Sequence, residues 1–175
     1  MEKKPDLRVM KTRRAIREAF TQLLAEKPFA AITVQNILDR AQVNRKTFYN
    51  HYHDKYDLAK QAMNDVGQDL RETAERILAL NTTDHLHDMY NALQRHRVEV
   101  LALWDVKADD GGSLNGLLGD YVRQLYLERA EICKPNENAC TVDLQARMYA
   151  ALATAYLKFV LELNGEYDFA TLQRA

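Results

Sequence analysis

The residue types between positions 42 and 58, QVNRKTFYNHYHDKYDL, suit the binding of a polyanion. The basic side chains Arg45, Lys46 and Lys55 lie among four aromatic rings and two histidines. Basic and amide side chains can donate hydrogen bonds to the edges of guanine or adenine, and tyrosine, threonine and histidine can bond to phosphate oxygens. Large rings are stabilised by burial. The segment therefore predicts one face that packs on a core and another that contacts nucleic acid.

A helix over residues 44–52 would separate these two faces. At about 100° per residue, Phe48 and Tyr52 lie on the same side, and Val43 precedes them. This apolar stripe is expected to pack on the preceding helices, because a helix this short is not stable alone. The other half of the helix presents Arg45, Lys46, Thr47, Tyr49 and Asn50.

Helical periodicity predicts the elements that hold this segment in place. Apolar side chains recur three and four positions apart over residues 8–26, and Pro28 then ends the helix. Thr33 is an N-cap residue type in front of a short amphipathic helix, which ends at the break Gln42-Val43. A helix, a short turn and a second short helix form a helix-turn-helix arrangement.

Further helices are expected beyond this arrangement. Asp54 can cap the next one, whose start, Asp54-Lys55, is expected to present free backbone N–H groups and a lysine, a combination that suits phosphate. Apolar periodicity then predicts three long helices and a short final one capped by Asp168. The long helices are expected over residues 84–107, 113–133 and 142–163.

Charge divides the chain in two. Residues 1–60 hold thirteen Lys/Arg against seven Asp/Glu, a net charge of +6, whereas residues 61–175 hold eleven against eighteen, a net charge of −7. Glycine and proline are few, and strand-like alternation is not evident. We therefore expect an all-α fold with a helix-turn-helix domain over residues 1–61 and a C-terminal helical bundle over residues 62–175.

Residues 29–58, FAAITVQNILDRAQVNRKTFYNHYHDKYDL, resemble the N-terminal DNA-binding domain of the TetR family of transcriptional regulators. The matching positions are Thr33, the turn Ala41-Gln42-Val43, the run Thr47-Phe48-Tyr49-Asn50-His51-Tyr52, and Lys55. The resemblance covers about residues 8–60. More loosely, the segment is similar to a branch of the family that includes regulators linked to dihydroxyacetone kinases, whose function we do not carry over.

The resemblance implies how this surface would meet a double-stranded DNA operator. Base contacts would come from Gln35, Arg45, Lys46 and Tyr49, with Asn50 on the same exposed half. Phosphate contacts would come from Thr33, Thr47, Tyr49, His51 and Lys55. Arg13, Arg14 and Arg17 form either a solvated helix face or further contacts to the DNA backbone. The glycine of the family's turn is Gln42 here, and a positive φ at this residue would cost on the order of 1 kcal/mol.

The segment 146–163 predicts a dimer interface. Fourteen of its eighteen residues are apolar, so the helix should be covered on two sides. One side would face its own domain and the other a symmetric partner, as the family resemblance also implies. Ala153, Tyr156 and Val160 are the residues that we expect at this interface. The alternative is a central helix in a monomeric bundle.

The function expected is that of a homodimeric repressor that binds a palindromic operator and is released by a small-molecule effector. The effector pocket would involve Tyr90, Trp104, Tyr121 and Tyr149. The alternative is a DNA-bound protein of the same fold that is controlled by a protein partner. A nucleophile–base pair, a metal cluster or a phosphate loop is not evident, so neither catalysis nor a cofactor is expected.

The location expected is the bacterial cytoplasm, with association to the nucleoid through DNA. The start MEKKPDLRVMKTRR lacks the apolar region of a secretory signal, and an uncharged stretch long enough to span a bilayer is absent. The pair His85-x-His87 does not place two ligands on one helix face, so no metal site is expected. Cys133 and Cys140 are either two inert thiols or a redox pair.

Overall fold

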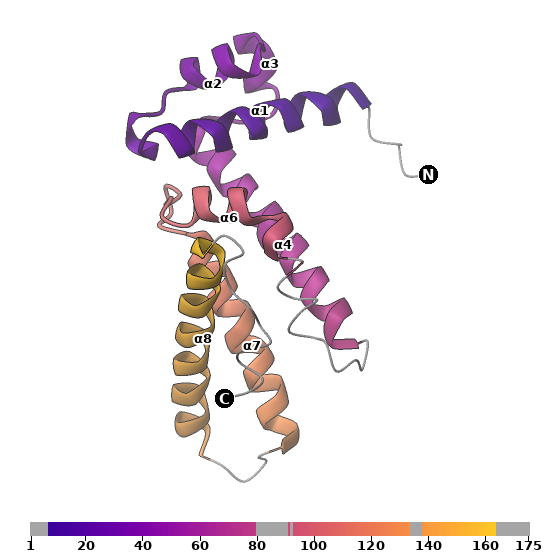
Figure 1. Cartoon of the computed structure of the whole chain (residues 1–175), viewed down its shortest axis with the longest axis vertical. Helices are drawn as coiled ribbons and strands as arrows, with labels where there is room; N and C mark the ends of the chain where they lie inside the picture. The colour runs from indigo at the N-terminus through magenta and orange to yellow at the C-terminus, as the bar shows by residue number, and fades with distance from the viewer. Residues whose placement is uncertain (1–6, 80–90, 92, 134–137, 164–175) are drawn as a thin grey trace.

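The computed structural model describes residues 7–79, 91, 93–133 and 138–163, and all regular elements within them are helices (Figure 1). This confirms the all-helical fold expected from the sequence. Tyr90, the first part of the helix expected over residues 84–107 and the short helix after Asp168 lie outside the described residues. Among the helices described, none is long and apolar enough to cross a membrane.

The first three helices form the head of the molecule, residues 7–52. Helix α1 (Leu7–Glu26) lies beneath the short α2 (Val34–Ala41) and α3 (Arg45–Tyr49), and the 3-10 turn η1 (Phe29–Ala31) connects α1 to α2 (Figure 1). The apolar faces of these elements meet in one core. Its most buried members are Ile16, Phe20, Ile32, Ile37, Phe48 and Tyr52.

Helix α4 (Lys55–Ala79) joins the head to the rest of the chain (Figure 1). The domain boundary that we expect at residues 61 and 62 falls inside this helix. The body consists of α6 (Arg97–Leu103), α7 (Leu114–Cys133) and α8 (Ala139–Glu162), of which α7 and α8 form an antiparallel hairpin. Helix α4 packs against α6 and α7, and α6 also contacts α1. The core of the head and that of the body are therefore continuous.

The helix expected over residues 84–107 is shorter and interrupted where the structure describes it. A turn at His96 divides it, and α6 ends at Leu103. The chain then folds back, because the Ala108 N–H donates to the Gly112 carbonyl at 2.8 Å and Gly111 adopts a φ of 81°. Val106 and Ala108 are buried in this turn, so the apolar pattern continues after the helix has ended.

Candidate nucleic-acid interface

Helix α2 begins at a reciprocal cap. The Thr33 hydroxyl accepts a hydrogen bond from the Asn36 N–H at 3.2 Å, and the Asn36 side-chain oxygen accepts one from the Thr33 N–H at 3.1 Å. Both interactions satisfy backbone donors that a helix start leaves unpaired. Gln35 follows on the exposed side, where its amide donates to Asp39 at 2.7 Å. The cap predicted at Thr33 is therefore present, and Gln35 lies on the solvent-facing surface.

The turn between α2 and α3 contains a left-handed residue. Gln42 has φ 53° and ψ 41°, and it alone among the non-glycine residues described has a positive φ. Its N–H and that of Val43 both donate to the Leu38 carbonyl, which closes the end of α2. This turn satisfies helix-end carbonyls but costs about 1 kcal/mol for a residue with a Cβ. Gln42, which stands where the family has a glycine, therefore has the positive φ that the sequence analysis considered.

Helix α3 is held by a cap and by its buried rings. Asn44 accepts a hydrogen bond from the Thr47 N–H at 2.7 Å. Phe48 and Tyr52 are at most 2% exposed, and Val43 packs partly buried against the same core. The inward stripe predicted from helical spacing is confirmed. Tertiary packing therefore fixes a five-residue helix that has too few internal hydrogen bonds to form alone.

The outward half of α3 carries cationic and polar groups. Arg45, Lys46, Tyr49 and Asn50 are exposed, and Thr47 and His51 are half-buried. The Arg45 guanidinium lies 5.6 Å from the centre of the Tyr49 ring, an arrangement that suits a cation–π contact. The ring in turn packs edge-on against Phe48. The core thus orients Tyr49, and Tyr49 orients Arg45.

The start of α4 differs from the phosphate site expected there. Asp54 accepts hydrogen bonds from the N–H groups of Tyr56 and Asp57, each at 2.8 Å, so these two donors are not free. Asp57 in turn accepts one from the His53 N–H at 2.8 Å. The Lys55 ammonium donates to three backbone carbonyls between α1 and α2. The N-cap predicted at Asp54 is present, and it pairs two of the backbone N–H groups that were expected to be free.

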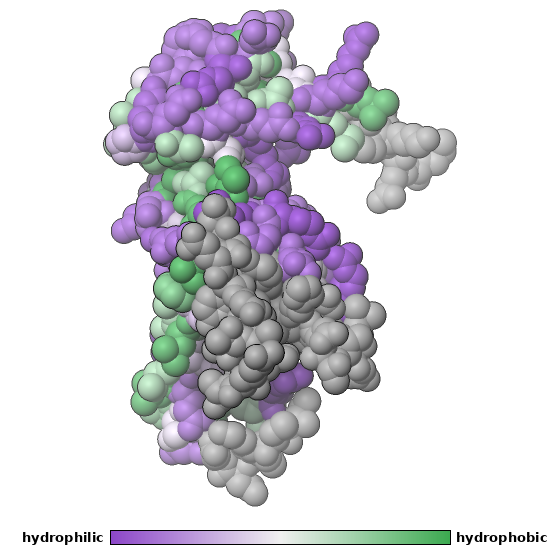
Figure 2. All heavy atoms as spheres, viewed as in Figure 1, coloured by the Kyte–Doolittle hydropathy of each residue, from purple (hydrophilic) through white to green (hydrophobic). Residues whose placement is uncertain are grey.

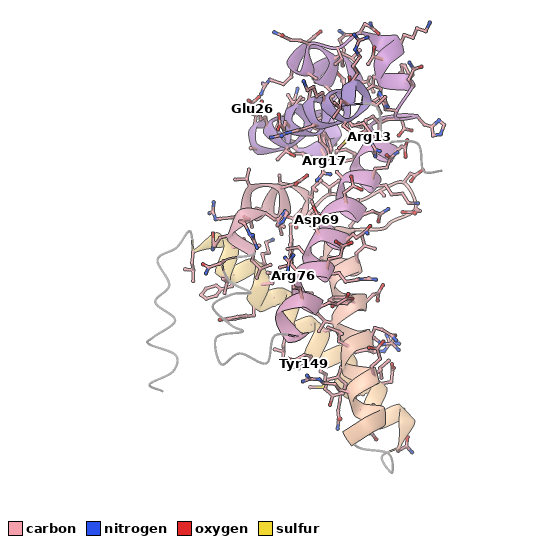
Figure 3. The ribbon with its side chains drawn as sticks, turned by 90° about the vertical axis from the view of Figure 1, so that its right-hand side faces the viewer. Arg13, Arg17, Glu26, Asp69, Arg76 and Tyr149 are labelled. Carbon is pink, nitrogen blue, oxygen red and sulfur yellow. The ribbon has the colours of Figure 1, made fainter. Side chains whose placement is uncertain are left out.

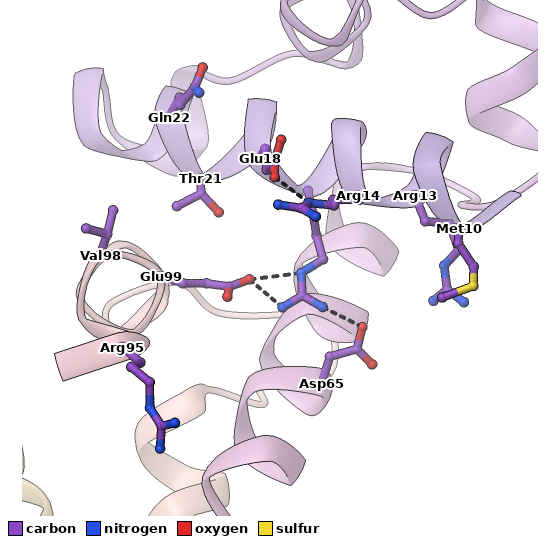
Figure 4. A pocket seen from close by; sticks show the side chains of 11 residues that line it. Met10, Arg13, Arg14, Glu18, Thr21, Gln22, Asp65, Arg95, Val98 and Glu99 are labelled. Atoms are coloured by element: carbon purple, nitrogen blue, oxygen red, sulfur yellow. Dashed lines mark hydrogen bonds and ion pairs between the residues drawn. The ribbon is translucent and has the colours of Figure 1, made fainter. Parts of the chain in front are cut away.

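Two arginines make connections that sequence reasoning missed. Arg40 on α2 binds both carboxylate oxygens of Glu26 on α1, each at 2.8 Å, and this hydrogen bonding lowers the pKa of Glu26. Arg17 on α1 donates to Glu99 on α6 and to Asp65 on α4 (Figure 4). Both partners of Arg17 are far along the chain, so helical spacing gave no signal for either pair.

An open cleft of about 600 Å³ lies where α1 faces α4 and α6 (Figure 4). It is lined mainly by polar and charged side chains, among them Arg13, Arg17, Asp65, Arg95 and Glu99. Arg17 crosses this junction between head and body (Figure 3). Of the two alternatives considered for Arg17, a solvated helix face does not describe it, because its guanidinium binds two carboxylates of the body.

Three of the four residues predicted for an effector pocket lie in the described part of the chain, and Tyr90 lies outside it. Trp104 is 7% exposed, and Lys158 lies near its ring. Tyr149 is 56% exposed on α8 and packs against Tyr126. Tyr121 is half-buried beneath the Arg71 guanidinium, and burial, with a smaller contribution from Glu75, raises its pKa. None of these three lines the cleft beside Arg17.

Helix α8 exposes an apolar face to solvent. Figure 2 shows apolar residues along the α8 edge of the body, whereas the head is mostly hydrophilic. Of the three interface residues predicted, Tyr156 is exposed, Ala153 is half-buried, and Val160 is 2% exposed inside its own subunit. The exposed large side chains of this face are Leu144, Met148, Tyr149, Leu152, Tyr156 and Phe159.

Helix α2, the turn at Gln42 and the short α3 are arranged as in the helix-turn-helix class of DNA-binding domains, in which the second helix is the one that enters the major groove. The family model for bacterial regulatory proteins, tetR family, matches residues 16–62. The head therefore carries a DNA-binding domain similar to that of the tetR family. An uncharacterized HTH-type transcriptional regulator of Bacillus subtilis (strain 168), YxbF, is 45% identical over 58 residues. The match spans 33% of this chain but only 15% of that relative.

Two solved structures share the fold of nearly the whole chain. A gamma-butyrolactone receptor (ArpA-like protein) matches with a TM-score of 0.60 and 17% identity, over 97% of this chain and 94% of the other. The dihydroxyacetone kinase operon activator DhaS matches with a TM-score of 0.55 and 15% identity, over 89% of this chain and 90% of the other. At these identities the likeness concerns the fold alone.

Proposed function

We propose that this chain is a transcriptional repressor that binds a palindromic operator as a homodimer and is released by a small-molecule effector. The observation that carries the proposal is the exposed half of α3. A helix of this size fits the major groove, and Arg45 and Lys46 can donate to guanine while Asn50 and Gln35 can pair with adenine. Thr33 and Tyr49 are exposed and Thr47 and His51 are half-buried, and their side chains can donate to phosphate oxygens.

The dimer proposed here uses the exposed face of α8. Six large apolar side chains that are between 43% and 69% exposed lie on this one helix. Association that removes this apolar surface from water is favourable. A second copy related by a two-fold axis covers the same face on both subunits. It also provides the second recognition helix that a palindromic site requires.

Release by an effector is supported by the fold of the body. The gamma-butyrolactone receptor, named for a small-molecule ligand, shares the helical arrangement over nearly the whole chain. Helix α4 and the Arg17 contacts join this body to the head, so a ligand that favours another position of α6 or α4 would shift the head. Screening for compounds that displace the protein from DNA would identify the effector.

Capture of genomic DNA fragments by the purified protein tests the proposal. The expected result is enrichment of a few fragments that share a two-fold symmetric sequence, protected as two half-sites about one helical turn apart. The variant with both Arg45→Ala and Lys46→Ala serves as the control and should enrich none of them. Equal recovery of all fragments by the wild-type protein would contradict sequence-specific regulation.

A further inference from the structure

The ammonium group of Lys55 has a complete set of hydrogen-bond partners inside the head. Its Nζ lies 3.0 Å from the Phe29 carbonyl, 3.2 Å from that of Ala30 and 2.8 Å from that of Ile32. A lysine ammonium has three N–H donors and no acceptor. Three carbonyls therefore use all of its donors, and none is left for a phosphate oxygen.

The surroundings of Lys55 stabilise the cation in this position. Its Nζ lies 4.8 Å from the centre of the Phe29 ring and 5.4 Å from that of Tyr56, distances at which an aromatic face attracts a cation. The two rings pack edge to face at 5.2 Å, and Phe29 also contacts the buried Phe20. The three carbonyls belong to η1 and the residue that follows it, so they form the negative end of a short helical turn.

The hydrogen bond from Lys55 to the Ile32 carbonyl connects the residues on either side of α2 and α3. Ile32 directly precedes the cap of α2, and Lys55 is the first residue of α4. The hydrogen bond between them therefore joins the two ends of the segment that contains α2, the turn and α3. Fixing both ends of this segment limits how far the short α3 can tilt relative to α1.

We infer that Lys55 is a positioning residue, which closes the helix-turn-helix through three backbone carbonyls and does not bind DNA phosphate. Its contribution to operator binding, which rests on the proposed function, is to set the orientation of α3. Loss of the ammonium then reduces the preference for operator over random DNA. The number of ions released on binding stays the same.

Three measurements on Lys55→Met, which keeps most of the apolar stem, test this inference. Lys60→Ala is the matched control, because it removes one positive charge from the same helix, where Lys60 pairs with the exposed Asp110. Amide exchange of Ala31 and Ile32, which donate to the Pro28 and Phe29 carbonyls, should be about tenfold faster in Lys55→Met and unchanged in Lys60→Ala.

DNA binding provides the other two measurements, on the captured operator and on a random duplex of about 30 base pairs, long enough for two half-sites. For Lys55→Met we expect an operator preference about tenfold lower than for Lys60→Ala, and the same slope of log K against log salt. A slope smaller by about one than that of Lys60→Ala would identify a phosphate contact and overturn the inference.

Each of the remaining outcomes tests either the positioning role of Lys55 or the proposed function. Unchanged amide exchange, or an unchanged operator preference, in Lys55→Met would show that the three contacts do not hold the segment in its binding orientation. If the wild-type protein binds neither duplex, the proposed function fails. The exchange rates of Ala31 and Ile32 then still determine whether Lys55 closes the helix-turn-helix.

Discussion

Arg17 on α1 and Glu99 on α6 form an ion pair at 2.6 Å across the junction of head and body, although 82 residues separate them in the chain. The same guanidinium binds Asp65 on α4 at 2.8 Å. Burial alone would lower the pKa of Arg17, but the neighbouring carboxylates outweigh it, and the net shift is upward. One side chain thus links three helices that belong to the two parts of the molecule.

The Arg17–Glu99 pair should show measurable coupling in stability. Both side chains are at most 25% exposed, so solvent screens the pair only in part. In a cycle of Arg17→Ala, Glu99→Gln and the double variant, we expect an interaction free energy of about 1 kcal/mol, measured by denaturant unfolding. The exposed pair Arg14–Glu18 is the control and should give less than about 0.5 kcal/mol. Equal values for the two cycles would contradict a link between head and body.

Substitution of the exposed cations of α3 should reduce discrimination between DNA sequences. For Arg45→Ala and for Lys46→Ala we expect a loss of about 1–3 kcal/mol on the operator and relaxed preference at one position of each half-site. Competition binding with operators mutated one base pair at a time measures both effects. The exposed Lys107 of the body, changed to Ala, is the control. If random DNA loses as much affinity as the operator, these residues contact the backbone instead.

Phe48 should be a determinant of stability. Its ring is fully buried, so Phe48→Ala should lower the free energy of unfolding of the head by about 3–5 kcal/mol. Its neighbour Tyr49 is 45% exposed, and Tyr49→Ala should cost less than about 1 kcal/mol. Thermal unfolding followed by circular dichroism measures both. A Phe48→Ala variant that melts like the wild type would mean that the ring does not support the core.

A charge on the exposed face of α8 should separate the proposed dimer. Leu152 and Tyr156 are 69% and 43% exposed, so replacing either by Glu leaves the interior of the subunit intact. In the dimer, however, the substitution places two like charges close together across the two-fold axis. Sedimentation at micromolar concentration should show a folded monomer that binds the operator weakly.

Asn115→Glu, on the exposed first turn of α7, provides the control for this experiment and should remain dimeric. A wild-type protein that sediments as a monomer would remove the α8 interface from the proposal. So would dimers that persist in both α8 variants.

Local signals in the sequence were sufficient to predict the main features of the head. The caps at Thr33 and Asn44, the inward pair Phe48 and Tyr52, and the exposed half of α3 all follow from residue type and helical period. Even the left-handed Gln42 could be anticipated, because the family resemblance places a glycine there. These features depend on residues that are near one another in the chain.

Features that depend on distant residues could not be predicted. The pair Arg17–Glu99 and the closure by Lys55 require the tertiary fold, since a lysine at a helix start is equally compatible with a phosphate contact. The apolar period of residues 93–104 continues through the turn at His96, so periodicity did not reveal the interruption. Burial of Val160 shows the same limit, because a helix that is apolar on most sides does not indicate which side its own subunit covers.

Because α4 is one continuous helix, a small rotation at its body end displaces its head end, and with it the recognition helix, by several ångströms. The 25 residues of α4 span about 37 Å at about 1.5 Å per residue. A rotation of this rod by about 5° around its body end displaces its head end by about 3 Å. In the proposed two-fold dimer the two heads move in opposite directions, so the spacing of the recognition helices changes by about 6 Å. That is roughly a sixth of the 34 Å between half-sites one turn apart, so the two helices no longer fit both half-sites at once.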